Sequence, residues 1–383
     1  MSWPSARLFH LGGGLRAFNG YDGTIVLQTK TLEGNVVSVS TPSYLAAYDV
    51  LHRLGKPVVG IDFLTLHPEF DNSQPPNWRS YYSQGGSATL CAEQADQWSF
   101  LAHAAFQHRE PVLYDVSERI KYQLRVCDWR LRQISEAYRD QLHSRLRDKK
   151  FADGKRFLDG FTWLGYLAIQ VFLIDACVLR DYLTEYFVWT RIRSGELPAD
   201  TTIRQMSALK KRYLDKTDSK EQLVILLQEA TAEDGWLQEL GRYRDLIVHA
   251  APLESAGKHL FAVCRQQRIS QEHILPTIQL PLPLDPAGLH KARSNGEHLE
   301  DPDFAFARMG YVIGDAGQHP DGLEYAYQAL CRFAWLASHM LAIAPLTAEI
   351  PDVTPHIIGE VKVIPGSGNG DDSGASGDGS KHD

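Results

Sequence analysis

The chain has few cysteines, and their arrangement builds neither a disulfide framework nor a zinc site. Five cysteines are spread over 383 residues, and none of them forms a C-x-x-C pair. An odd number of widely separated cysteines is typical of reduced proteins inside the cell. We therefore expect a cytoplasmic protein without a structural metal.

The chain also lacks the glycine-rich motifs of nucleotide cofactors. Its opening segment LGGGLRAFNG, residues 11–20, has neither the Lys-Ser/Thr of a phosphate loop nor the spacing of a dinucleotide fingerprint. This segment favours a flexible turn, and no cofactor is expected. Because the sequence turns to glycine so early, it also lacks the basic and then apolar pattern of a signal peptide.

No apolar run is long enough to predict a membrane span. In the best candidate, Phe161 to Leu179, the uncharged run ends after 14 residues, at Asp175. A central Asp costs about 2.5–3.5 kcal/mol in a bilayer, so a buried helix is favoured and no membrane partner is expected.

A basic excess is missing too. The formal net charge is −8, and such a chain would repel a polyanion at long range. This argues against non-specific coating of nucleic acid. A short or structured nucleic acid that reaches a local basic site remains compatible with the charge.

The sequence patterns predict a mostly α fold with an N-terminal α+β region. The runs TIVLQTKT and VVSVST flank a turn-like segment at Leu32–Asn35 and predict a hairpin. Ser43 can cap a helix from Tyr44 to Leu54 that Gly55 ends, and a buried strand follows from Pro57. From about Cys91 onward, apolar residues recur at helical spacing.

We therefore expect four segments. They are an N-terminal α+β region (1–115), a long connecting helix (116–150), an antiparallel helical bundle (155–345) with a β-ribbon insertion at about 256–318, and a disordered acidic Gly/Ser tail (346–383).

One helix-length stretch, Trp236 to Pro252, points to a chemistry. Arg244 and His249 lie five residues apart in it, and Asp245 follows the arginine. The chain contains two further pairs with this spacing, Arg268/His273 and Arg293/His298, so the spacing alone carries little information. Those two pairs fall in a turn and a loop, which do not fix side-chain geometry.

The stretch is strongly amphipathic. Trp236, Leu240, Tyr243 and Ile247 form an apolar stripe, whereas Arg242, Asp245 and His249 share a polar one. We expect Asp245 to accept the imidazole N–H of His249. On an ideal helix Arg244 lies about 140° away from His249, so the helix must kink near Arg244 for both to reach one phosphate.

The run LQELGRYRDLIVHAAP resembles the R-x4-6-H signature of HEPN domains (higher eukaryotes and prokaryotes nucleotide-binding). This resemblance implies an all-α, HEPN-like bundle with a metal-independent endoribonuclease site, acting in antiviral defence or a toxin–antitoxin system. Carried over by position, it assigns Arg244 and His249 to catalysis, with Asp245 as the intervening polar residue.

The expected chemistry is RNA cleavage by the 2′-OH of the substrate, with RNA such as tRNA as the partner. It needs a base, an acid and a cation near phosphorus, and one histidine serves both proton-transfer steps poorly. A homodimer through the bundle would pair two motifs in one cleft. Arg242, Lys210, Lys211 and Arg212 are candidate contacts to the RNA backbone.

Three alternatives stay open from the sequence. Arg244 and His249 can be ordinary structural residues that bridge helices. The protein can be a non-catalytic ligand-binding or assembly subunit, whose N-terminal region binds a regulatory partner. It can also be a nucleotide-binding regulator.

Overall fold

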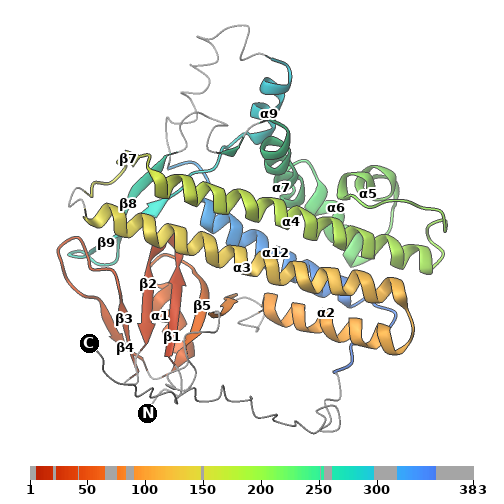
Figure 1. Ribbon diagram of the computed structural model, residues 1–383, viewed down its shortest axis with the longest axis horizontal. Coiled ribbons are helices and arrows are strands. Elements are labelled where there is room, and N and C mark those ends of the chain that lie inside the picture. The colour runs from red at the N-terminus through yellow and green to blue at the C-terminus, as the bar shows by residue number, and fades with distance from the viewer. Residues whose placement is uncertain are drawn as a thin grey trace, which may run out of the picture. The chain divides into compact units, whose positions relative to one another are not determined.

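A six-stranded antiparallel sheet forms the N-terminal part of the protein (Figure 1). Across the sheet the strands are β4 (Ser38–Ser40), β3 (Thr24–Leu27), β2 (Arg16–Asn19), β1 (Ala6–Leu11), β5 (Val58–Leu64) and β6 (Asn77–Ser80). The computed structural model describes residues 6–19, 23–41, 43–64, 76–82, 90–147, 151–250, 252–253, 261–296 and 317–350.

This sheet corrects the expected fold class. A mostly α, HEPN-like antiparallel bundle is wrong, because a six-stranded sheet and a second, three-stranded sheet stand beside the helices. The predicted β3–β4 hairpin is present, with Thr24 opposite Ser40. The pairing of β1 with β2 and β5 was not foreseen, because β1 and β2 are joined through glycines that mask their alternating pattern.

Those glycines form a buried turn, and the expectation of a flexible turn is wrong. Gly12–Gly14 are all buried, and Gly13 and Gly14 have left-handed φ angles of 70° and 84°. A Cβ on Gly14 would lie 2.6 Å from the carbonyl oxygen of Tyr138, and one on Gly13 would lie 2.6 Å from Cβ of Thr277. Both the backbone conformation and the close contacts therefore require glycine.

Helix α1 (Tyr44–His52) begins and ends close to where the sequence predicts. The Ser43 hydroxyl accepts a hydrogen bond from the backbone N–H of Ala46, as a helix cap does. Gly55 has a φ of 79° and follows the last turn. The chain then enters β5, the strand expected from Pro57.

Four long helices pack side by side next to the sheet. They are α2 (Leu90–Gln107), α3 (Pro111–Arg147), α4 (Gly160–Arg193) and α12 (Gly322–Leu341). Helix α3 contacts both α2 and α4, and α12 contacts all three (Figure 1). With 37 residues, α3 extends about 55 Å, so it reaches from this helical layer to β5, β6 and the glycine turn.

Helix α4 contains the apolar run that was weighed as a membrane span. It is the one helix in the described ranges that is long and apolar enough to cross a membrane by length and composition, and half of its most apolar window is buried within the protein. Its N-terminal end keeps Phe161, Trp163 and Leu164 between 41% and 48% exposed.

Short helices follow α4. They are α5 (Met206–Arg212), η2 (Leu214–Lys216), α6 (Gln222–Thr231), α7 (Trp236–Asp245) and the π-helical turn η3 (Leu246–Ala250). The basic residues of this region are thus divided between α5 and η2, with the break at Tyr213.

The predicted β-ribbon is present and larger than expected. Strands β8 (Ala262–Arg268) and β9 (Ile274–Gln279) form an antiparallel hairpin, and β7 (Arg156–Phe157) adds a third strand. Helix α9 (Pro286–Ser294) follows and contacts α7 and η3.

Residues 1–349 cluster as one compact unit, and the expected boundaries at 115 and 150 fall inside it. The expected disordered tail lies, from residue 351 on, outside the described residues.

Candidate active site at the π-helical end of α7

The apolar stripe of α7 anchors this helix in the core. Trp236 packs edge-on against Phe333 with ring centroids 4.8 Å apart, and Tyr243 packs against Tyr325 at 5.2 Å. The Tyr243 hydroxyl also donates a hydrogen bond of 2.7 Å to the carbonyl of Pro283. The predicted stripe is therefore correct, and it turns the polar stripe outward.

The helix changes form directly after Asp245. Residues Leu246–Ala250 form a π-helical turn, in which hydrogen bonds close five residues apart instead of four. Side chains five positions apart consequently come close to one another. Arg244 and His249 have this separation, and Arg244 Nη1 lies 3.5 Å from His249 Nε2. The change of helix form therefore brings together two side chains that an ideal α-helix would hold apart.

This contact constrains the tautomer of His249. A guanidinium has only donors, so His249 Nε2 must carry a lone pair to face it favourably. The imidazole is exposed, whereas the Arg244 side chain is 29% exposed. The lone pair that could take a proton thus faces the guanidinium in this structure, and it can act as a base once the guanidinium turns to a phosphate.

Asp245 has a different partner from the one expected. Its Oδ1 lies 3.3 Å from Arg244 Nη1, so in the described contacts the carboxylate positions the guanidinium and not the imidazole. The π-helical turn begins after Asp245 and shifts His249 relative to it, so the spacing of one α-helical turn no longer applies.

A second histidine lies next to this pair. His290 on α9 has its ring centroid 6.4 Å from that of His249, and its Nε2 lies 3.4 Å from the Ser294 hydroxyl. The sequence did not point to His290, because it lies 41 positions after His249 in the segment expected to be an insertion.

A small basic pocket adjoins Arg244. Its volume is about 110 Å³, and four cationic side chains and one carboxylate line it: Arg180, Lys210, Arg242, Arg244 and Asp245. Of the predicted RNA contacts, the structure thus brings Lys210 and Arg242 to this place. Lys211 and Arg212 are exposed on α5 and do not line the pocket.

Arg180 is the member of this pocket that the sequence did not reveal. Its side chain is only 7% exposed, and its Nε donates a 3.0 Å hydrogen bond to Asp181. Burial opposes its charge, but the Asp181 carboxylate raises the pKa of Arg180, so the guanidinium stays protonated. Its position in a largely apolar helix is the available signal, since an arginine is rarely buried unless it is paired.

Gly241 gives this arginine its space. A Cβ at position 241 would lie 3.2 Å from Arg180 Nη1, closer than most side chains allow. Lys210 reaches the pocket from α5 and donates to Asp215 at 2.6 Å. Lys210, Arg180 and Arg244 therefore each have an acidic neighbour. An anion entering the pocket would replace these carboxylates as the hydrogen-bond acceptor of the cations.

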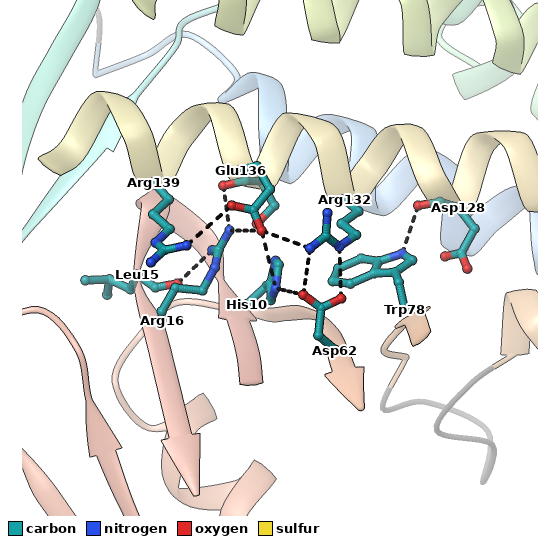
Figure 2. A network of polar contacts seen from close by, with 10 residues as sticks. His10, Leu15, Arg16, Asp62, Trp78, Asp128, Arg132, Glu136 and Arg139 are labelled. Atoms are coloured by element: carbon teal, nitrogen blue, oxygen red, sulfur yellow. Dashed lines mark hydrogen bonds and ion pairs between the residues drawn. The ribbon is translucent and has the colours of Figure 1, made fainter. Parts of the chain in front are cut away.

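A separate polar cluster joins the sheet to α3 (Figure 2). His10 Nε2 lies 3.1 Å from Asp62 and 3.9 Å from Glu136, and these three residue types could hold a metal ion. Arg132 already donates to both Asp62 oxygens at 2.9 Å, and Arg16 lies 3.8 Å from Glu136. Because both carboxylates face guanidinium groups, the cluster fits a structural role better than a metal centre.

His10 in this cluster should make the stability of the protein depend on pH. Burial, and then Arg16, lower the pKa of His10 from 6.5 to about 3. Below pH 6.5 the unfolded chain binds a proton at His10 that the folded protein refuses, so His10 costs stability progressively as the pH falls toward 3. Replacing His10 with Gln removes this cost.

The free energy of unfolding of wild type, relative to that of His10→Gln, should therefore fall by about 2 kcal/mol between pH 7.5 and pH 5. Urea unfolding at both pH values measures the difference. Parallel pH profiles for the two proteins would show that His10 titrates normally in the folded state.

Comparison with family models, curated proteins and solved structures found no match.

Proposed function

We propose that this chain is a metal-independent endoribonuclease, in which His249 takes a proton and Arg244 stabilises the phosphate. The observation that carries the proposal is the 3.5 Å approach of Arg244 Nη1 to His249 Nε2 on the π-helical turn. Cleavage by an internal 2′-OH requires a cation and a proton acceptor close to one phosphate, and these two side chains are neighbours. The resemblance of this motif to that of HEPN ribonucleases supports the proposed activity, but it does not extend to the fold.

The proton-transfer steps fit two histidines of one chain. His249 Nε2 has the lone pair for the 2′-OH proton, and His290 donates a proton to the departing 5′-oxygen. With ring centroids 6.4 Å apart, both imidazoles can reach oxygens of one phosphate. The P–O5′ bond breaks as the 2′-oxygen attacks phosphorus, which leaves a 2′,3′-cyclic phosphate and a 5′-hydroxyl.

The basic pocket supplies the binding part of the proposal. A phosphate next to the scissile one can enter the space lined by Lys210, Arg242 and Arg180, where it gains charge-assisted hydrogen bonds. These contacts hold the backbone without reading its sequence. A flexible RNA such as a tRNA loop suits this arrangement, since the chain as a whole is acidic.

The wider role follows the same proposal. An RNase with this motif would act in the cytoplasm in antiviral defence or a toxin–antitoxin pair, with the N-terminal region as the contact for a regulatory partner. A homodimer remains part of the proposal, although the nearby His290 removes the chemical need for a second chain to supply an imidazole.

Incubation of the purified protein with end-labelled tRNA in EDTA tests the activity. Cleavage that leaves 2′,3′-cyclic phosphate ends is the expected result. Products with 3′-hydroxyl and 5′-phosphate ends would contradict the mechanism, because the substrate 2′-OH would not have been the nucleophile.

A binding protein without catalysis is the second candidate. The contact between Arg244 Nη1 and His249 Nε2 favours it, since a lone pair that faces a guanidinium is not free to take a proton. Saturable binding of tRNA without cleavage by the same preparation would support this function.

A further inference from the structure

A second cleft lies away from α7, between α1 and α12. Its volume is about 640 Å³, within the range of about 300–1,000 Å³ that is usual for small-molecule sites. Its walls come from α1, from the start of β5, from the segment that follows β6 and from one face of α12. Segments far apart in the sequence thus meet around one hollow.

Aromatic side chains dominate these walls. Five line the cleft: Tyr48, Tyr81, Tyr82, Tyr327 and Trp335. Tyr48 and Tyr81 stack on each other with ring centroids 4.2 Å apart and an interplanar angle of 22°. Arg7 donates a 2.8 Å hydrogen bond to the Tyr48 hydroxyl, which helps to hold this ring in place. On the α12 side, Trp335 remains 41% exposed.

The polar groups of the cleft are few and of both signs. Arg332 on α12 supplies a cation, and α1 supplies the Asp49 carboxylate and the His52 imidazole. Burial raises the pKa values of Tyr81, Tyr82 and Tyr327, so their hydroxyls stay protonated and can donate hydrogen bonds. The cleft therefore offers flat apolar surfaces, neutral donors, one cation and one carboxylate.

We propose that this cleft binds a nucleoside monophosphate. A nucleobase has two flat faces that stack on aromatic rings and an edge that both donates and accepts hydrogen bonds. Arg332 lies one helical turn from Trp335 on the same face of α12, so a base stacked on Trp335 places its phosphate within reach of the guanidinium. Asp49 on the opposite wall can accept hydrogen bonds from the ribose hydroxyls or a base amine.

The cleft and the candidate active site are distinct. Tyr325 and Phe333 of α12 pack against α7, whereas Tyr327 and Trp335 of the same helix line the cleft. The two sites share no lining residue. The binding proposal stands whether or not the protein cleaves RNA.

Isothermal titration calorimetry of the full chain with AMP, GMP, CMP and UMP tests the proposal. We expect saturable binding of at least one of them with a Kd below about 1 mM. Trp335→Ala should weaken that binding at least about 10-fold, because the stacking surface is lost. The matched control is Trp163→Ala, since Trp163 is similarly exposed, at 48%, but lies on α4.

A second variant separates the phosphate from the base. Arg332→Ala should weaken binding of that nucleotide about 10-fold and leave binding of the corresponding nucleoside within about 2-fold of wild type. Thermal unfolding curves that match wild type establish that each variant is folded. The proposal is overturned by wild-type protein that binds none of the four nucleotides up to about 1 mM, or by equal effects of Trp335→Ala and Trp163→Ala.

Discussion

Replacing His249 with alanine is expected to lower the rate constant of RNA cleavage by about 100-fold to 10,000-fold, which is the usual contribution of a positioned general base. The side chain is exposed on the π-helical turn, so its removal leaves the core intact. Single-turnover cleavage of labelled tRNA in EDTA, with the variant's thermal stability measured in parallel, gives the comparison.

The chain provides a matched control for this variant. His273 also follows an arginine by five residues, but this pair lies at the β8–β9 turn. There Arg268 donates a hydrogen bond to the carbonyl oxygen of Gln271. His273→Ala should therefore cleave RNA at the wild-type rate. Equal rates for His249→Ala and wild type would remove His249 from the active site.

His290→Ala separates the two proton-transfer roles. Loss of a general acid matters only when the leaving oxygen needs a proton, and a 4-nitrophenolate leaving group does not need one. Uridine 3′-(4-nitrophenyl phosphate) should thus restore most of the rate to His290→Ala and little to His249→Ala. The opposite pattern would exchange the two assignments.

Mixing the two inactive variants tests whether the site belongs to one chain. If His249 and His290 act within one protomer, the mixture stays inactive, because no protomer holds both imidazoles. Recovery of up to about a quarter of the wild-type rate would place the acid and the base on different subunits, as a shared two-fold site requires.

Replacing Asp62 with alanine should lower the free energy of unfolding by about 3–5 kcal/mol, because it leaves the Arg132 guanidinium with only its longer, 3.4 Å contact to Glu136. The Asp62 side chain is 3% exposed and accepts two hydrogen bonds from Arg132, which is itself only 16% exposed. His10 loses its acceptor in the same variant. Urea unfolding at pH 7.5 measures the effect.

An exposed ion pair gives the comparison for this loss. Asp96 pairs with Arg125 at 3.1 Å, with both side chains more than half exposed, so Asp96→Ala should cost no more than about 1 kcal/mol. Adding Arg132→Met to Asp62→Ala should recover part of the larger loss by removing the stranded charge. If Asp62→Ala and Asp96→Ala destabilise equally, solvent reaches the buried cluster and screens it.

The sequence predicts the local structure of the candidate site well and its distant parts poorly. The apolar stripe from Trp236 to Ile247 follows from helical spacing, and it correctly buries Tyr243 and Leu240. The change to a π-helical turn at Leu246 has no comparable sequence signal, although it decides where His249 lies. Arg180 and His290 reach the site from other helices, and helical periodicity says nothing about such contacts.

The same limit explains the error in fold class. The β3–β4 hairpin and α1 follow from a turn and a cap that are local in sequence, and both were predicted. The pairing of β1 with β5 joins Phe9 to Ile61, and no local pattern reports it. The short β6, which pairs with β5, lies directly after the Pro75-Pro76 dipeptide and reads as loop.

The glycine turn at residues 12–14 has a consequence for how the protein is made. Gly14 packs on Tyr138 and Gly13 on Thr277, so the turn between the first two strands completes its contacts only after residue 277 has left the ribosome. Synthesis of the residues between Gly14 and Thr277 takes roughly 15–50 seconds at about 5–20 residues per second. During synthesis the N-terminal sheet therefore exposes surface that the finished protein covers, and binding by a chaperone would protect it until β9 emerges.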